Sequence, residues 1–381
     1  MEKKSSPPLY LQCASPKIFF FALIWLLVLL IIGTLAQRTM GLHDAQIKYF
    51  SSWFTTFYLL PVPGGRLVMS VIFVNLLCKL LFASPWHWKR SGIIITHLGA
   101  LFLLGGGFIT AYFSVEGSMV IPEGGKERFF QDYHLLEIAF ITPGEKENDV
   151  IAFSGSKVKP GTVIQDSDFP AVLKVKKVIN NCKIVMRSQT PSDDLRGLAS
   201  QYELIETPSD KEGRNNPGMI YSISGLDEVN NGTYIASLSH PEYKTLMMGD
   251  KPYQIHLRRL TYELPFTIEL LDFQKHVHPG TAMASSFKSI VNVIRGDIPQ
   301  RVEIYMNHPL RDEGYTFYQS SYMQQAGQEA TVLAVVKNYG MLFPYISSIV
   351  MCIGLLIHLL ILLPKLIQPP KPKATIAGAN T

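Results

Sequence analysis

The amino-acid sequence predicts a membrane protein of mixed α and β structure, with four transmembrane helices and one large β-rich domain between the third and fourth of them. Hydrophobic residues make up 47% of the 381 residues, and charged residues only 17%. The apolar residues are concentrated in four runs that are long enough to cross a hydrocarbon layer of ~30 Å. Residues 114–340, in contrast, are ordinarily polar. This division argues against the two or three soluble domains that the length alone would allow.

The distribution of charge supports the same division. Residues 114–340 contain 23 basic and 28 acidic residues, whereas the rest of the chain contains 12 basic and 2 acidic residues. Because the basic excess lies beside the apolar runs, it indicates membrane topology and not the binding of nucleic acid. Four crossings then place both termini in the cytoplasm and residues 114–340 in the periplasm. We therefore expect an integral protein of the lipid bilayer, of the kind found in a bacterial inner membrane.

The boundaries of the segments follow from hydropathy. The first apolar run is too long for a signal peptide, and no small-x-small cleavage site follows it. The aromatic-rich loop after it is expected to lie in the membrane interface. In chain order we predict a cytoplasmic tail (1–17), the first helix (18–36), an extracytoplasmic loop (37–66), the second helix (67–83), a cytoplasmic turn (84–91), the third helix (92–113), the extracytoplasmic domain (114–340), the fourth helix (341–363) and a cytoplasmic tail (364–381).

The long polar section has the pattern of a β domain. Apolar residues alternate in its second half, as at Phe266, Ile268 and Leu270, and turn signals such as Pro279-Gly280 separate the alternating stretches. No long helical period occurs there, so a sandwich-like domain is expected. Residues 188–217, rich in polar and turn-forming residues, predict an exposed loop or a loose insertion.

The four cysteines do not form a recognisable site. No CxxC motif occurs, and the one cysteine well inside the polar section, Cys182, has no partner there. Neither a thiol-redox centre nor a disulfide framework is therefore predicted.

The third predicted helix carries one residue of unusual character, His97. An imidazole inside a bilayer is costly, and such residues usually face a bundle interior, a cavity or a bound group. Gly99 and the run Gly105–Gly107 follow it and allow another backbone or a flat molecule to approach. Two interpretations are open. His97 is either a buried histidine bonded to a neighbouring helix or a ligand of a metal or cofactor held in the membrane.

A second membrane histidine, His358, lies about five residues before the cytoplasmic end of the fourth helix. At ~1.5 Å per residue, His97 and His358 both lie roughly 8 Å inside the same membrane face. Two imidazoles at matched depth can form an axial pair for haem iron. A histidine on a partner protein is an equally open choice for the second ligand.

Outside the membrane, His43, His276, His278 and His308 are candidate metal ligands or cofactor contacts. His276-x-His278 would place both rings on one face of a strand, which suits a metal, but no third or fourth ligand at a telling spacing accompanies them, so a surface loop is favoured. His308 belongs to a turn and is expected to pack locally.

Several passages of the chain resemble the ResB family, also called CcsB, of the system II cytochrome c biogenesis pathway. The most specific passage begins at Asn307-His308-Pro309-Leu310 and is followed by a closing apolar helix. The other passages are Tyr49-Phe50-Ser51-Ser52-Trp53-Phe54, Val74-Asn75-Leu76-Leu77-Cys78, Thr96-His97-Leu98-Gly99 and Gly314-Tyr315-Thr316-Phe317-Tyr318-Gln319-Ser320-Ser321-Tyr322.

This resemblance implies a subunit that handles haem in the membrane. Members of the family work with a CcsA-like membrane protein to move haem b outward and attach it to apocytochrome c. The third-helix histidine of the family maps onto His97, which is therefore expected to bind haem iron in the membrane. The sequence has no tryptophan-rich haem loop, so a non-autonomous subunit of a cytochrome c haem lyase is expected.

Two other functions compete with this one. The chain could be a scaffold that binds apocytochrome c or braces CcsA without touching haem. It could also be a b-type electron-transfer protein, but such proteins usually need four histidines in the membrane, and this chain offers two. A haem spectrum with and without His97 separates the first two functions.

Overall fold

The computed structural model describes residues 8–57, 60–144, 148–155, 158–166, 169–188, 192–210, 215–240, 245–248, 251–280, 284–296, 298–325 and 328–367. The chain divides into two compact units. The helical unit comprises Met1–Ala36, Asp44–Ser114 and Tyr339–Thr381, and the β-rich unit comprises Gln37–His43 and Val115–Asn338. Most of the two predicted cytoplasmic tails (residues 1–7 and 368–381) falls outside the described residues.

Four helices are long and apolar enough to cross a membrane, as the hydropathy predicts. Their ends differ from the predicted ends by a few residues, because helix ends extend into flanking polar residues that apolar counting leaves out. The first helix, for example, starts at a proline, which is favourable in the first turn. These helices are α2 (Pro16–Met40), α4 (Gly65–Cys78) with its π-helical continuation η2 (Lys79–Ala83), α5 (Ser91–Phe113) preceded by the 3-10 turn η3 (Trp88–Arg90), and α7 (Phe343–Ile367).

Residues 37–66, predicted as an extracytoplasmic loop, contain several short regular elements. The helix α2 runs on to Met40, and the rest forms short elements: α3 (Leu42–Ala45), the π-turn η1 (Gln46–Phe50) and a hairpin of β1 (Phe54–Phe57) and β2 (Leu60–Pro63). The aromatic residues suit the pleated surface of a hairpin as well as a membrane interface. A short helix, α1 (Leu9–Cys13), also lies within the predicted tail.

The buried side-chain amide of Asn75 on α4 forms hydrogen bonds with the turn between α1 and α2. Its Nδ2 donates hydrogen bonds to the carbonyl oxygens of Cys13 (2.5 Å) and Ser15 (2.9 Å). These carbonyls lie at the end of α1, where backbone acceptors have no partner within the helix. The polar residue in the middle of an apolar helix thus has a structural role.

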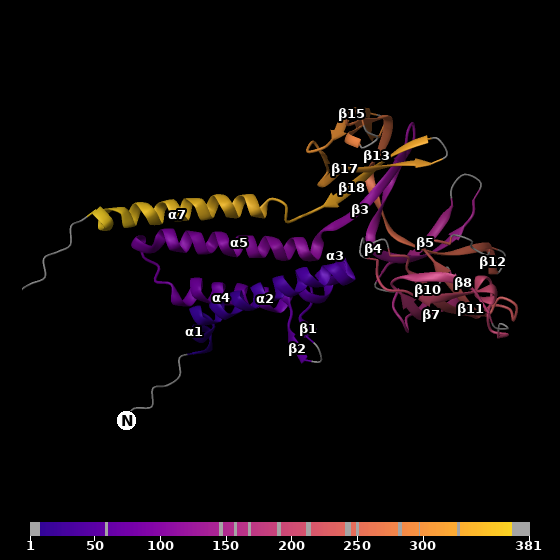
Figure 1. Cartoon of the computed structure of the whole chain (residues 1–381), viewed down its shortest axis with the longest axis horizontal. Helices are drawn as coiled ribbons and strands as arrows, with labels where there is room; N and C mark the ends of the chain where they lie inside the picture. Colours follow the sequence, from indigo (N-terminus) through magenta and orange to yellow (C-terminus); the bar gives the residue numbers. More distant parts are fainter. Residues whose placement is uncertain are drawn as a thin grey trace, which may run out of the picture. The chain divides into compact units, whose positions relative to one another are not determined.

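Three glycines, seven residues apart on α5, let α7 pack closely against it (Figure 1). A Cβ atom at Gly92 would lie 2.6 Å from the Cα of His358, one at Gly99 would lie 2.6 Å from the Cγ of Met351, and one at Gly106 would lie 2.5 Å from the Cγ of Phe343. A seven-residue spacing keeps these positions on one face of the helix. The face of α5 formed by Gly92, Gly99 and Gly106, here called the glycine face, is therefore the contact surface for α7.

The β-rich unit is built mainly from a ten-stranded antiparallel sheet, which confirms that the long polar section is rich in strands. Eight strands lie in the order β15-β14-β13-β4-β3-β18-β17-β16, while β5 pairs with β4 and β12 with β13. The strands are β3 (Val115–Pro122), β4 (Lys126–Thr142), β5 (Asp149–Phe153), β12 (Thr245–Met248), β13 (Lys251–Val277), β14 (Ala284–Arg295), β15 (Ile298–Tyr305), β16 (Leu310–Asp312), β17 (Tyr315–Gln325) and β18 (Gln328–Lys337).

A second sheet, in the order β11-β10-β7-β6, and a two-stranded ribbon of β8 and β9 complete this unit. The prediction of an exposed loop over residues 188–217 is partly wrong, because a helical turn and the strand β9 lie within it. These short elements were not predicted, because most of that stretch is polar. The elements are β6 (Val163–Asp166), β7 (Phe169–Ile179), β8 (Cys182–Met186), α6 (Leu198–Gln201), β9 (Tyr202–Glu206), β10 (Gly218–Ser224) and β11 (Gly232–Ser237).

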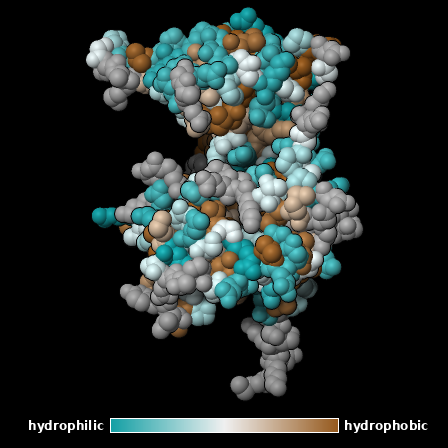
Figure 2. Space-filling view, turned by 90° about the vertical axis from the view of Figure 1, so that its right-hand side faces the viewer, coloured by the Kyte–Doolittle hydropathy of each residue, from teal (hydrophilic) through white to brown (hydrophobic). Residues whose placement is uncertain are grey.

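Two strands, β4 and β13, are long enough to serve two separate hydrophobic cores. Ile138 of β4 and Leu257 of β13 belong to one core, together with residues of the second sheet. Phe130 of β4 and Leu264 of β13 belong to the other, with β14, β17 and β18. The β-rich unit therefore has two lobes, and its surface in Figure 2 is mixed, with hydrophilic residues spread over both.

Candidate functional site

A cavity of about 430 Å³ lies within the helical unit and is lined mostly by apolar side chains. Its volume falls in the range of roughly 300–1,000 Å³ that is usual for small-molecule sites. The walls come from the turn between α1 and α2, from α2, from α4 with η2, and from α5. The lining residues are Ala14, Pro16, Phe19, Leu23, Leu26, Met69, Ile72, Asn75, Leu76, Lys79, His97, Ala100, Leu103 and Leu104.

His97 is on the wall of this cavity and makes a hydrogen bond that defines its tautomer. Its Nδ1 lies 2.7 Å from the carbonyl oxygen of Ile93, one helical turn earlier. A carbonyl can only accept, so we assign the proton of a neutral ring to Nδ1. The lone pair is then on Nε2, the atom that a histidine uses most often to bind a metal when its other nitrogen is held by the backbone.

His358 does not line this cavity. Its backbone packs against Gly92 on the glycine face of α5, and its Nδ1 is buried without a hydrogen-bond partner among the described residues. Because each residue turns an α-helix by about 100°, His97 lies about 140° around α5 from Gly92. The structure therefore places the two histidines on different sides of α5, although the sequence puts them at matched depth.

Sequence reasoning missed two polar residues of the cavity wall, Asn75 and Lys79. The amide of Asn75 is committed to the carbonyls of Cys13 and Ser15. Lys79 is half-buried and is the first residue of the π-turn η2. The sequence signal for Lys79 was a basic residue near the end of an apolar run. Such a residue usually marks only the end of a membrane crossing.

In the β-rich unit, the structure places His276 and His278 at the surface and His308 in a local contact. The ring of His308 stacks on Tyr305 with 4.6 Å between centroids and a tilt of 2°, so its local packing is confirmed. His276 lies opposite Ser286 near the end of β13. Throughout the described ranges, no group of three or more His, Cys, Asp or Glu residues could hold a metal ion.

Two further histidines meet in the β-rich unit although they are far apart in the sequence. The rings of His43 and His134 stack with 3.3 Å between centroids and a tilt of 13°. The described residues supply no third donor for a metal at this pair. We therefore describe it as a packing contact within the β-rich unit.

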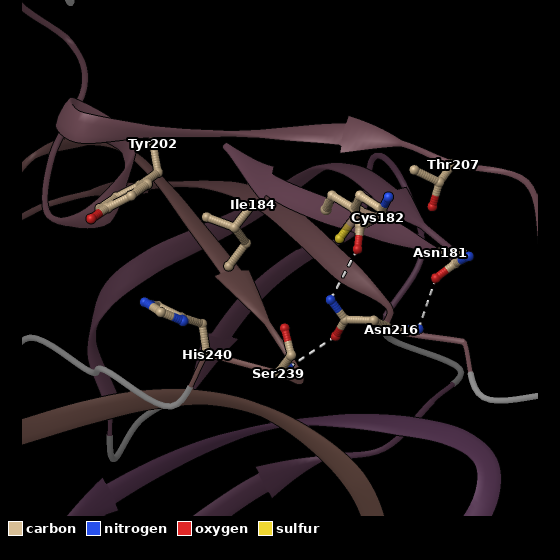
Figure 3. A pocket seen from close by; sticks show the side chains of 9 residues that line it. Asn181, Cys182, Ile184, Tyr202, Thr207, Asn216, Ser239 and His240 are labelled. Carbon is tan, nitrogen blue, oxygen red and sulfur yellow. Dashed lines mark hydrogen bonds between the residues drawn. The ribbon is translucent and has the colours of Figure 1, made fainter. Parts of the chain in front are cut away.

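A second pocket, of about 550 Å³, lies in the β-rich unit beside β8 and β9 (Figure 3). The side chain of Asn216 spans one end of it. Its Nδ2 donates to the carbonyl oxygen of Cys182 (3.0 Å), and its Oδ1 accepts from the backbone N–H of Ser239 (2.9 Å). Burial raises the pKa of the Cys182 thiol, which keeps the sulfur protonated and a poor nucleophile. The amide of Asn216 thus links β8 to the chain that follows β11.

Comparison with known proteins identifies relatives of this chain. Residues 242–329, which run from β12 into β18, match the ResB-like family. The chain is also similar to the protein NrfI of Wolinella succinogenes, with 29% identity over 121 residues. The aligned part is 31% of this chain and 13% of NrfI, so the match spans only a small part of that relative's length. These matches confirm the resemblance that the motifs around His308 predicted.

Proposed function

We propose, from the relationship to the ResB-like family, that this chain is a subunit of a system II cytochrome c synthase. In this proposal it carries haem b within the membrane and helps attach it to apocytochrome c, together with a CcsA-like partner. The family match supports a role in cytochrome c biogenesis. The observation that carries the haem-handling part is the apolar membrane cavity with the Nε2 of His97 on its wall.

The chemistry of this cavity suits haem as a transported substrate. Side chains such as Phe19, Leu23 and Leu104 give the macrocycle an apolar environment. The Nε2 of His97 offers one axial bond to iron, and the hydrogen bond from Nδ1 to Ile93 fixes the ring and increases its basicity. Apolar walls exclude water and oxidants from iron that must stay reduced until it is transferred.

The second axial ligand in this proposal is a histidine of the CcsA-like partner. The support is the position of His358, which lies against the glycine face of α5 and not on the cavity wall. With His358 as the second ligand, either α5 or α7 would have to turn. The packing at Gly92, Gly99 and Gly106 opposes such a turn.

The orientation completes the proposal. Lys89 and Arg90 are exposed beside the start of α5, and the positive-inside rule assigns that end to the cytoplasm. His97 then takes up haem from the cytoplasmic half of the bilayer. The β-rich unit lies outside, where apocytochrome c is matured, and its strands can hold an unfolded segment of that protein.

The test is a substitution of His97 in the complex with the CcsA-like partner. We expect His97→Ala to lower the haem that co-purifies with the complex, measured by absorption, and to stop cytochrome c maturation. Added imidazole should restore part of both, because it can occupy the vacated space and bind iron. His358→Ala is the matched control, and we expect it to retain haem and maturation.

Each opposite outcome has a defined meaning. Unchanged haem content in the His97 variant would contradict the membrane ligand and favour a scaffold that binds apocytochrome c or CcsA without haem. A loss of haem in the His358 variant that imidazole restores would identify His358 as the second ligand.

A further inference from the structure

Lys79 has an unusual position on the wall of the membrane cavity. It is the only lysine or arginine among the lining residues, all of which belong to the described part of the chain. It lies on one stripe of the helix with Ile72, Asn75 and Leu76, at spacings that keep residues on the same face. The stripe that carries Lys79 is therefore the stripe that faces the cavity.

The ammonium group of Lys79 lacks a counter-ion in its own unit. No lining residue is acidic, and within the described ranges no carboxylate pairs with Lys79. The sequence of the helical unit contains only two acidic residues, Glu2 and Asp44. Because a half-buried cation among apolar groups is costly unless it is paired, this position calls for an anion from outside the unit.

The backbone at Lys79 is also irregular. The α-helical hydrogen bonding of α4 ends at Cys78, and a π-turn begins at Lys79. Such turns are found frequently at functional sites, since one wider turn re-aims a side chain. A lysine that only marks the membrane boundary needs no such turn, because its flexible stem reaches water by itself.

We propose that Lys79 binds the anionic end of the amphipathic ligand in this cavity, a propionate carboxylate of haem b. This inference rests on the proposed function and deepens it. His97 and Lys79 then recognise two different parts of one molecule, the iron and the carboxylate. Together they set the direction in which the macrocycle lies in the cavity.

The test compares haem b with its dimethyl ester, which has the same macrocycle and iron but no carboxylate charge. The full chain is placed in nanodiscs of phosphatidylcholine and titrated with each compound, with the dissociation constant taken from the absorption change. We expect the native chain to prefer haem b about tenfold, the size of one charge-assisted hydrogen bond. Lys79→Met should remove this preference and bind the ester as the native chain does.

Lys89→Met is the matched control. Lys89 is an exposed lysine near the same end of the bundle and is absent from the cavity wall. This variant should keep the preference for haem b. Equal binding of the ester by all three proteins would show that each cavity is folded.

Four outcomes would overturn the inference. If Lys79→Met keeps the preference, the carboxylate is bound elsewhere. If Lys79→Met keeps the preference for haem b but no longer binds phosphatidylglycerol in nanodiscs that contain this lipid, Lys79 binds a lipid phosphate. If the native chain binds neither compound, the proposed function fails as well. If His97→Ala loses the absorption change while Lys79→Met keeps the preference for haem b, the proposed function stands and only the role of Lys79 is contradicted.

Discussion

The Nε of Arg258 lies 2.6 Å from the Oε1 of Glu137, across the pairing of β13 with β4. The Glu137 side chain is only 4% exposed, whereas that of Arg258 is 30% exposed. The pair lies next to Ile138 and Leu257, at the end of the core that both strands share with the second sheet. It therefore joins the two long strands where each continues toward the other core.

Removing the arginine should destabilise this junction. We expect Arg258→Met to lower the free energy of unfolding by about 3 kcal/mol, because a buried carboxylate without its partner is costly. Hydrogen exchange of the β4 and β13 amides in the full chain measures the effect locally. Arg128→Met is the control, since Arg128 and Glu263 form an ion pair of the same length that is 52% and 54% exposed. That pair should contribute less than about 1 kcal/mol. Equal losses in the two variants would contradict this account.

The stability of the β-rich unit should fall as the solution is acidified, in part because of His256. Burial and, to a smaller extent, the charge of Arg258 together lower the pKa of His256 from 6.5 to about 4. Between these two values the unfolded chain binds a proton that the folded chain does not, so stability falls as the pH falls. Above 6.5 this histidine has no effect.

We expect His256→Gln to weaken the pH dependence of hydrogen exchange in β13 across that interval. Near neutral pH and above, the native chain and the variant should show the same pH dependence of hydrogen exchange, even where their absolute stabilities differ. Parallel curves for the two proteins through the whole interval would show that other groups cause the acid sensitivity.

The glycine face of α5 gives a prediction with controls in the same helix. Gly99→Leu and Gly106→Leu should each lower the free energy of unfolding by about 1–3 kcal/mol, the usual cost of inserting side chains into a packed contact. Gly105→Leu and Gly107→Leu should have little effect, because a Cβ at either position meets nothing within 4 Å. Thermal unfolding of the full chain in detergent measures all four. A loss of the same size in the Gly105 and Gly107 variants would mean that these residues are also packed.

The orientation can be tested with reporter fusions. We expect a reporter fused after Lys373 to be active only in the cytoplasm and one inserted near Gly213 to be active only outside. The reason is the basic excess beside the apolar helices, of which Lys89 and Arg90 are examples. Activity of both reporters on one side of the membrane would contradict four crossings.

Much of the architecture could be predicted from the sequence, because its signals are local. Apolar length identifies the four helices, and alternation such as Phe266, Ile268 and Leu270 identifies strands. The sharing of β4 and β13 by two cores could not be predicted, since it depends on bulges and pairings between distant residues. Short elements such as β9 were not predicted, because they lie in a stretch that is mostly polar.

The candidate site was predictable to a similar extent. His97 stood out as a polar residue inside an apolar run, and the structure places it on a cavity wall. Its relation to His358 was not apparent from depth, because depth says nothing about the angle around a helix. Lys79 did not stand out in the sequence, because a lysine near the end of an apolar run usually only marks the end of a membrane crossing. Only the packing of α4 against its neighbours shows that it lines the cavity.

The place of β3 and β18 in the large sheet has a consequence for how the protein is made. β3 directly follows α5, β18 is the last strand before α7, and yet the two are neighbours in the middle of the sheet. Until the ribosome has delivered β17 and β18, β3 is an open strand edge, which is a site of aggregation. Folding that depends on such distant pairing is slow. The nascent domain should therefore need a chaperone until its final strand has been synthesised.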